Sequence, residues 1–336
     1  MANRLILFCF GIVFTAACSS DPKEKEQVLF ETPLDSINAI IQNEPNNAVA
    51  FAARALIQLE ARNLAEAQSD AKKAMELDSI NPIVLENYGD IYLMLNQTRI
   101  SRDSWKTCAE LNRNNISCRF KLAKLLFFVR NYEESLDYLN EILMVEGAND
   151  RALFLKASIY KELGDTSSAI QFYQTAIDAN PENFDAYEQL GVLYAQREDS
   201  LAIAFYNRAI QLRPNEPGVY YNLGIYYQSK EQWNRALEAY SSAVQIDPNH
   251  FNSHYNMGYI HILISAWGQG AVHFTDAIRA KDDYYQAYYG RAYCFEMLGD
   301  VTRAKKDYEQ ALNIKLDYKP AEEGLGRIAK LLQYGN

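Results

Sequence analysis

The sequence predicts an all-α solenoid of about eight helical hairpins, and two features of the chain carry this prediction. Small side chains return at a period of 34 residues, a spacing typical of repeat architectures. Within each period, apolar residues follow the three-and-four spacing of helix faces and stop at turn residues. The first small position of each period holds Ala55, Gly89, Ala123, Ala157, Gly191, Gly224, Gly258 and Ala292.

Residues 150–183 show what one period contains. An apolar helix face over residues 153–163 ends at Gly164-Asp165, where glycine stops a helix and aspartate can cap the next one. A second apolar face, over residues 169–177, ends at Asn180-Pro181, because proline cannot continue a helix interior. Each period is therefore expected to be a helix, a tight turn, a second helix and a stop.

Small residues allow two antiparallel helices to approach closely, so that larger neighbours interlock. A second small position follows the first by about twelve residues, and four residues later most periods carry a bulky side chain. This later position holds Ala71, Trp105, Leu139, Tyr173, Tyr206, Tyr240, Phe274 and Tyr308. We expect these side chains to fill the gap between adjacent hairpins.

One unit shows a familiar pattern nearly complete, in the order aromatic, Leu-Gly, Tyr, Ala, aromatic, Ala and Pro. Its residues are Tyr220, Leu223-Gly224, Tyr227, Ala236, Tyr240, Ala243 and Pro248. With these residues the chain resembles the tetratricopeptide repeat (TPR) family, which implies a right-handed superhelix. The units are framed as 48–81, 82–115, 116–149, 150–183, 184–216, 217–250, 251–284 and 285–318, and the fifth is one residue short in the turn around 197–200.

The ends of the repeat region read as single helices. Residues 32–47 contain an apolar helical stretch at 33–43 that resembles half a repeat. Residues 319–336 read as a capping helix with a polar outer side, which includes Arg327. Open-ended stacks need such polar caps.

The N-terminus resembles a bacterial lipoprotein signal. Residues 1–17 contain a positive start and an apolar run of thirteen residues, too short to span a bilayer. Small residues then precede Cys18, which would become the acylated first residue, and residues 18–31 are a polar tether. The alternative is an ordinary cleaved signal peptide with an incidental cysteine. The resemblance places the protein in the cell envelope, anchored to the outer membrane at its periplasmic face or at the cell surface.

Two of the remaining cysteines could form a disulfide, and the net charge disfavours one class of partner. In an exported protein, Cys108 and Cys118 either form a disulfide across a repeat junction or stay as two buried thiols. The net charge is −10 and no basic stripe is visible, which argues against nucleic acid as a partner.

No catalytic, metal or cofactor site is predicted. His254 and His261 share a helix face, but they occupy core aromatic positions and no carboxylate stands at a matching offset on that face. Gly324 and Gly326 imitate a dinucleotide fingerprint without the strand that it needs. The protein is therefore expected to be no enzyme and to need no cofactor.

The resemblance implies a concave groove lined by the first helix of each hairpin. Carried onto this sequence, the groove positions include Phe120, Lys124, Phe127, Phe154, Tyr221, Tyr255, Tyr259, Tyr289 and Tyr293. A row of exposed tyrosines favours partner binding, because aromatic rings provide a large contact area with a polar handle. The alternative is that these rings pack against one another and against the C-terminal helix.

These expectations combine into a lipid-anchored scaffold or adaptor that holds a protein or peptide partner in a Tyr/Phe-lined groove. Similar lipoproteins serve in outer-membrane assembly, secretion or motility, and cell-wall complexes, and the tyrosine- and asparagine-rich composition is similar to that of Bacteroidota proteins. The rival hypothesis is a glycan- or peptide-ligand-binding protein that uses the same aromatic groove. Self-association into a homo-oligomer is left open.

Overall fold

The structure, a computed structural model, describes residues 32–111 and 115–334, and every regular element in these residues is an α-helix. The predicted signal peptide at 1–17, the lipidation site Cys18 and the tether up to residue 31 lie outside the described residues. The helices are α1 Pro33–Asn43, α2 Ala48–Glu60, α3 Leu64–Leu77, α4 Pro82–Met94, α5 Thr98–Leu111, α6 Ile116–Phe128, α7 Tyr132–Val145, α8 Asp150–Glu162, α9 Thr166–Ala179, α10 Phe184–Gln196, α11 Leu201–Leu212, α12 Pro217–Ser229, α13 Trp233–Ile246, α14 Phe251–Leu263, α15 Trp267–Ala280, α16 Tyr285–Met297, α17 Val301–Ile314 and α18 Lys319–Tyr334.

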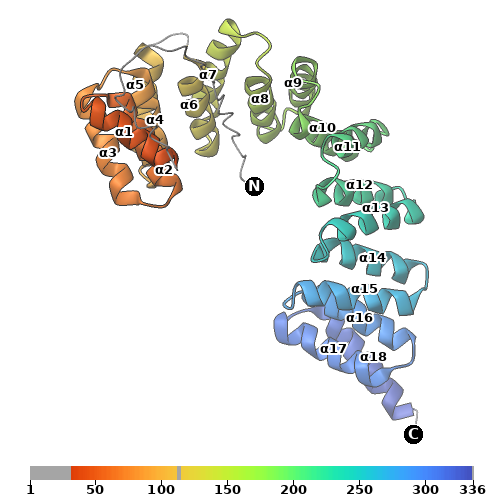
Figure 1. The fold of residues 1–336 in the computed structure, drawn as a ribbon. Helices are drawn as coiled ribbons and strands as arrows, with labels where there is room; N and C mark the ends of the chain where they lie inside the picture. Colours follow the sequence, from red (N-terminus) through yellow and green to blue (C-terminus); the bar gives the residue numbers. More distant parts are fainter. Residues whose placement is uncertain (1–31, 112–114, 335–336) are drawn as a thin grey trace, which may run out of the picture. The chain divides into compact units, whose positions relative to one another are not determined.

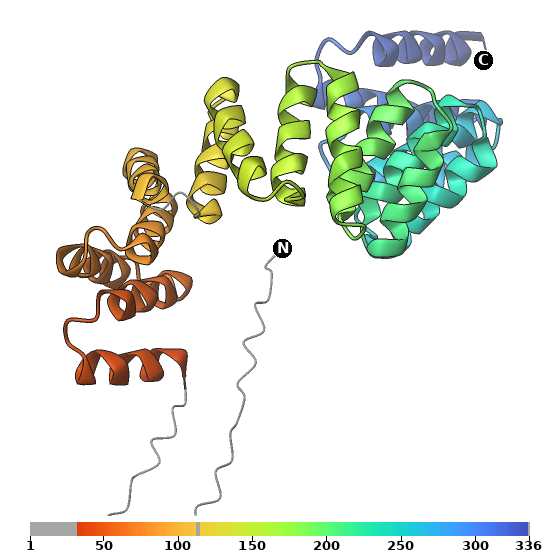
Figure 2. The ribbon, with the colours of Figure 1, turned by 90° about the horizontal axis from the view of Figure 1, so that it is seen from above.

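The helices form the predicted hairpins. The chain divides into two compact units between Ser104 and Trp105, inside α5. The first unit contains α1 to α4 and the start of α5, and the second contains the hairpins from α6–α7 to α16–α17, followed by α18. Within the second unit each hairpin packs on the next, as Figures 1 and 2 show from two directions.

An aromatic ring packed on a glycine holds several hairpins closed. A Cβ atom placed on Gly224 in α12 would lie 2.5 Å from the ring of Tyr240 in α13, and one on Gly191 in α10 would lie 2.6 Å from the ring of Tyr206 in α11. All eight residues at the first small position are buried. The predicted close approach of the paired helices is therefore confirmed.

Rings at the same repeat position also touch the helix that follows their hairpin. A Cβ atom on Gly290 in α16 would lie 2.5 Å from Phe274 in α15, and one on Gly324 in α18 would lie 2.5 Å from Tyr308 in α17. Phe274 also faces Gly258 of its own hairpin, where the distance to an added Cβ would be 3.0 Å. Each of these rings thus fills the gap between adjacent hairpins, as expected.

The turn inside every hairpin uses one left-handed residue at the same repeat position. Non-glycine residues hold φ values of 56–62° at this position, and the two glycines hold 80°. Left-handed backbone closes a helix by allowing the following amides to bond back to its last carbonyls; for example, the Asn131 amide donates to the Leu126 carbonyl at 2.9 Å. The residues are Arg62, Asn96, Arg130, Gly164, Glu198, Glu231, Ser265 and Gly299.

The first helix of most early repeats begins at an asparagine that caps it. The side chains of Asn47, Asn115, Asn149 and Asn183 each accept a hydrogen bond from the backbone amide three residues later. In the later repeats this position is taken by His250, whose Nδ1 accepts from the Ser253 amide at 3.3 Å, and by Tyr284, whose side chain makes no cap bond.

The C-terminal helix α18 is held by a charged cluster as well as by apolar packing. The Arg327 guanidinium donates to both carboxylate oxygens of Glu296 in α16, at 2.7 and 2.9 Å, and to the hydroxyl of Tyr308 at 3.2 Å. The Tyr308 hydroxyl donates to the same carboxylate at 2.6 Å. Arg327 is therefore a docking residue, and the expectation that it belongs to a solvated side was incomplete because α16 and α17 approach that side.

Two further observations concern the envelope hypothesis. Cys108 and Cys118 form a disulfide that joins the end of α5 to the start of α6. Across residues 32–111 and 115–334, none of the helices combines the length and the apolar character that crossing a bilayer requires.

Two glycines of α18 provide a matched test of ring packing. We expect Gly324→Ala to lower the free energy of unfolding by about 1–2 kcal/mol, because the collision with the buried Tyr308 ring outweighs the gain in helix propensity. Gly326→Ala, whose new methyl group would meet open space, should instead raise it by about 0.5–1 kcal/mol. Urea unfolding measures both, and equal effects of the two variants would contradict ring packing at Gly324.

The Glu296 carboxylate should make the docking of α18 depend on pH. Burial opposes its ionisation, but hydrogen bonds from Arg327 and Tyr308 and the Arg327 charge outweigh burial and hold the pKa of Glu296 below its ordinary value of 4.5. A lowered pKa stabilises the fold above that value, and this stabilisation is lost as the pH falls through the folded-state pKa.

We therefore expect Glu296→Gln to cost about 1 kcal/mol at pH 7, a modest value because Arg327 is half exposed and solvent screens the pair. The difference from the wild type should shrink as the pH is lowered below 4.5, when unfolding is followed by circular dichroism. Glu309→Gln, which removes an exposed carboxylate 3.8 Å from Lys305, is the control and should change little at either pH.

Candidate functional site

The first helices of the last three repeats bring a row of aromatic side chains together. Tyr221, Tyr255 and Tyr289 are each the fifth residue of their helix, in α12, α14 and α16. Each ring lies near an aromatic ring at the end of the same repeat, with ring centres 5.1 Å from His250, 5.1 Å from Tyr284 and 5.5 Å from Tyr318, respectively. The capping position that asparagine holds in earlier repeats is thus occupied by aromatic residues that cover the tyrosines.

These contacts bear on the two alternatives left open for the tyrosine row. Tyr221, Tyr255 and Tyr289 are half-buried, because each is also packed against the ring between hairpins, at 5.8, 5.6 and 5.8 Å from Tyr240, Phe274 and Tyr308. For these three residues the structure follows the alternative in which the rings pack against one another.

At the fifth and ninth positions of these first helices, two large side chains nevertheless remain exposed. Tyr259 in α14 is 41% exposed and Ile225 in α12 is 42% exposed. Tyr293 in α16 is half-buried, with its ring centre 5.9 Å from that of Trp267. We call the following set the tyrosine face: Tyr221, Ile225, Tyr255, Tyr259, Tyr284, Tyr285, Tyr289, Tyr293 and Tyr318.

The pKa values show that hydroxyl groups from successive repeats converge on this face. Burial raises the pKa of Tyr255, and the nearby hydroxyls of Tyr259, Tyr285 and Tyr289 raise it further. Burial, with Tyr255, Tyr289 and Tyr285 as neighbours, raises the pKa of Tyr318 to about 12. Tyr255 and Tyr318 therefore stay protonated at neutral pH and keep hydrogen-bond donors at the surface of an apolar patch.

The other predicted groove residues lie in α6 and α8. Phe120 lies under the Arg151 guanidinium at 4.2 Å, Phe127 contacts Phe128 and Tyr132, and Phe154 has its ring centre 5.3 Å from that of Tyr173. These ring and cation contacts stay within α6 to α9, and Lys124 is exposed. The structure thus groups these four residues apart from the tyrosine face.

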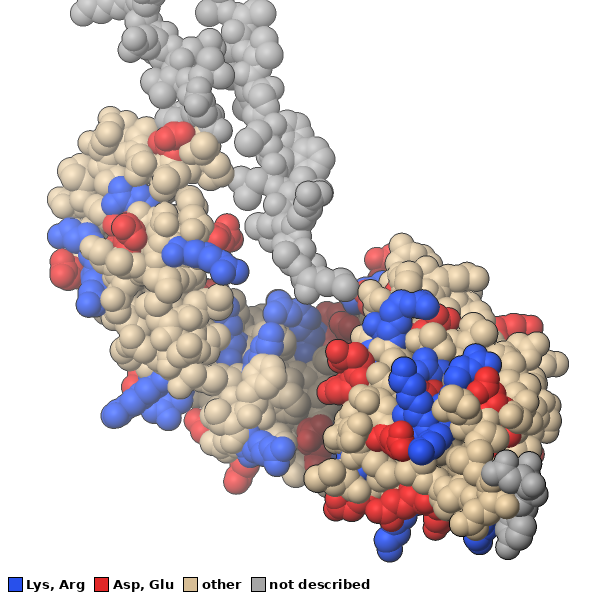
Figure 3. Space-filling view, turned by 90° about the horizontal axis from the view of Figure 1, so that it is seen from below, with Lys and Arg blue, Asp and Glu red and all other residues tan. Residues whose placement is uncertain are grey.

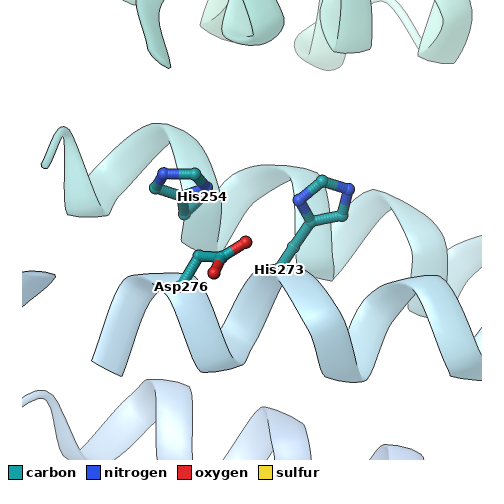
Figure 4. A group of neighbouring side chains, drawn as sticks. All are labelled: His254, His273 and Asp276. Carbon is teal, nitrogen blue, oxygen red and sulfur yellow. The ribbon is translucent and has the colours of Figure 1, made fainter. Parts of the chain in front are cut away.

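A cluster that the sequence reasoning missed lies in the seventh repeat. His254 comes from α14, while His273 and Asp276 come from α15, and their ligand atoms all lie within 4.8 Å of one another (Figure 4). The helix face of His254 and His261 carries no carboxylate at a matching offset, whereas Asp276 stands on the second helix of the hairpin. The 34-residue frame pairs these two helices, and that was the signal available to find the cluster.

The histidines of this cluster are incompletely paired. Nε2 of His254 lies 3.1 Å from the carbonyl oxygen of Pro248, whereas the buried Nδ1 atoms of His254, His261 and His273 have no hydrogen-bond partner among the described residues. Burial, with the neighbouring His261 and His254, lowers the pKa of His273 to about 4.

The face drawn in Figure 3 shows no basic stripe among the described residues. On the face that Figure 3 shows, Lys and Arg side chains are interspersed with Asp and Glu, and uncharged stretches separate them. The net charge of −10 agrees with this picture.

Family models match part of the repeat region. A model described as "TPR repeat" matches residues 157–197 and 198–230, and two described as "Tetratricopeptide repeat" match residues 217–250 and 285–318. The last two ranges coincide with the sixth and eighth units framed from the sequence.

Curated relatives share shorter segments. Photosystem I assembly protein Ycf3 of Prochlorococcus marinus is 37% identical over 70 residues, covering 20% of this chain and 40% of that protein. Tetratricopeptide repeat protein 34 of Mus musculus is 24% identical over 199 residues, covering 52% of this chain and 35% of that protein. The chain thus spans less than half the length of these relatives.

A solved structure shares the fold. The crystal structure of a tetratricopeptide repeat protein from Parabacteroides merdae superposes with a TM-score of 0.51 at 16% identity, covering 73% of this chain and 97% of that one. Residues 157–250 and 285–318 thus match models of the tetratricopeptide repeat, and the solved structure shares the fold.

Proposed function

We propose that this protein is a scaffold that binds an extended segment or a helix of a partner protein on the tyrosine face. Tetratricopeptide repeats indicate a role in protein–protein interaction, and the Prochlorococcus relative is named for the assembly of a multiprotein complex. The observation that carries the proposal is the exposure of Tyr259 and Ile225, at 41% and 42%, next to the half-buried tyrosines of the tyrosine face.

The packing of these half-buried tyrosines favours the binding of a partner. Tyr255 and Tyr289 are each held by two ring neighbours, so little side-chain entropy remains to be lost when a partner docks. Aromatic rings with un-ionised hydroxyls provide apolar contact and hydrogen bonds on one surface, which is the composition of interface hot spots.

The proposal extends to the cell envelope. We infer that Cys18 carries a lipid anchor to the outer membrane of a bacterium and that residues 18–31 tether the fold to it, because the preceding residues have the composition of a lipoprotein signal. A tether of 14 residues reaches up to about 50 Å. The partner would then belong to an outer-membrane assembly, secretion or motility, or cell-wall complex.

A glycan or peptide ligand is the second candidate. The exposed ring of Tyr259 offers a flat apolar surface of the kind that can stack on such a ligand. The two candidates differ in what they capture, so one set of variants separates them.

Removal of the exposed ring should weaken partner binding. We expect Tyr259→Ala to reduce the yield of one dominant crosslinked protein in intact cells at least tenfold, since a buried interface tyrosine contributes about 2 kcal/mol or more. Crosslinking followed by mass spectrometry measures the yield, with Leu298→Ala as the matched control because Leu298 is also exposed but lies just after α16, in the hairpin turn.

If Tyr259→Ala and the double variant Tyr255→Ala/Tyr259→Ala both give the same yield of the crosslinked partner as the wild type, the tyrosine face is not the binding site. Binding on a glycan array that both variants lose, without a crosslinked protein, would favour the second candidate.

The anchor has its own test. Cys18→Ser should move the protein from the membrane to the soluble fraction, because the serine hydroxyl cannot take the place of the acylated thiol. Fractionation followed by immunoblotting measures the shift, and Cys294→Ser, a change at a buried free cysteine, is the control. Unchanged membrane association of Cys18→Ser would show that lipidation is not the tether.

A further inference from the structure

The cluster of His254, His273 and Asp276 has the composition and the placement of a metal-binding site. Imidazole nitrogens and carboxylate oxygens are the ligands that divalent zinc accepts in proteins. The three side chains project from the two facing helices of one hairpin, and their ligand atoms lie within 4.8 Å of one another.

The hydrogen bond of His254 leaves one nitrogen available to a metal. Because the Pro248 carbonyl can only accept, the proton lies on Nε2, and Nδ1 presents its lone pair. This Nδ1 atom is buried and has no partner in the part of the chain that the structure describes. A second-shell bond from the other ring nitrogen to a backbone carbonyl is the usual way in which a protein orients a metal-binding histidine.

The two ligands on α15 share one face of that helix. His273 and Asp276 are three residues apart, so their side chains lie one above the other and both can face α14. The Nδ1 atom of His273 is also buried without a partner among residues 32–111 and 115–334. His254 and Asp276 line a cavity of about 330 Å³, which gives an ion and its water a route to the cluster.

We propose that His254, His273 and Asp276 bind one zinc ion, with water in the remaining coordination position. Tetrahedral zinc places its ligand atoms roughly 3.3 Å apart, so the side chains must draw together by at most about 1.5 Å. Asp276 also accepts a hydrogen bond from Arg279 at 2.7 Å. Because Arg279 is well exposed, it can move away when zinc binds or stay hydrogen-bonded to the carboxylate oxygen that does not bind zinc.

His261 provides the control within the same group of histidines. Its ring is stacked on that of His273, parallel to within 3° at a centre distance of 5.1 Å. The lone pairs of its nitrogens lie in the plane of its own ring and therefore do not point at His273. It is also half-buried, and its Nδ1 is likewise unpaired among the described residues. It therefore matches the proposed ligands in burial and in chemistry but lies outside the cluster.

The experiment is a zinc titration of the full-length chain, purified in mild detergent with a tag that contains no histidine and stripped with EDTA. Isothermal titration with ZnCl2 should show one site per chain. Asp276→Asn and His273→Gln should each weaken the affinity at least tenfold, whereas His261→Gln and His250→Gln should stay within threefold of the wild type. Cobalt should reproduce the stoichiometry and give the visible absorption of a tetrahedral site.

Circular dichroism in the absence of metal shows whether each variant remains folded, and Asp276→Asn preserves the shape of the side chain. Saturable binding lost in Asp276→Asn and His273→Gln but kept in His261→Gln would support the site. Absence of saturable binding, wild-type affinity in Asp276→Asn, or equal losses in His261→Gln and His273→Gln would overturn it.

Discussion

The contact between a ring and a small residue is the constraint on which the rest of this structure depends. Tyr206, Tyr240, Phe274 and Tyr308 lie against glycines that leave no room for a methyl group. Phe274 lies against a glycine of its own hairpin and also against one of the following helix. A ring in that place closes the hairpin and sets the spacing to the next one. Because each repeat contacts only its neighbours, the same contact must recur at every junction, which is why the period is visible in the sequence at all.

The tyrosine face depends on this packing. The fifth residue of each first helix lies beside the ring between hairpins, so a tyrosine there is half-buried, as Tyr221, Tyr255 and Tyr289 are. The residue at the end of the repeat can either cap the next helix or cover that tyrosine. Asn149 and Asn183 cap, His250 does both, and Tyr284 only covers. The last repeats thus exchange a cap for an aromatic surface, and an aromatic surface is what a protein partner would recognise.

How far prediction succeeded depended on whether a feature repeats. Eight hairpins, the buried small positions, the knobs between hairpins and the half repeat at residues 33–43 follow from a pattern seen many times, so each was predicted from residues such as Gly224 and Tyr240. The exposed fraction of Tyr255 could not be predicted, because it depends on Tyr284, which is twenty-nine positions away in sequence and belongs to no apolar helix face. The cluster of His254, His273 and Asp276 occurs once, so its residues do not recur with the period, although the repeat frame does pair the two helices that carry it.

The sequence by itself determined the hairpin, its length and its two contact positions, because helix periodicity and turn residues act locally and the repeat multiplies the signal. Only the tertiary structure decided which tyrosines remain exposed, that Arg327 docks the last helix on Glu296, and that two histidines meet an aspartate. The physical reason is that exposure, ion pairing and ligand geometry are properties of facing surfaces. They depend on the side chains that neighbouring helices place opposite one another, and a single helix face does not contain that information.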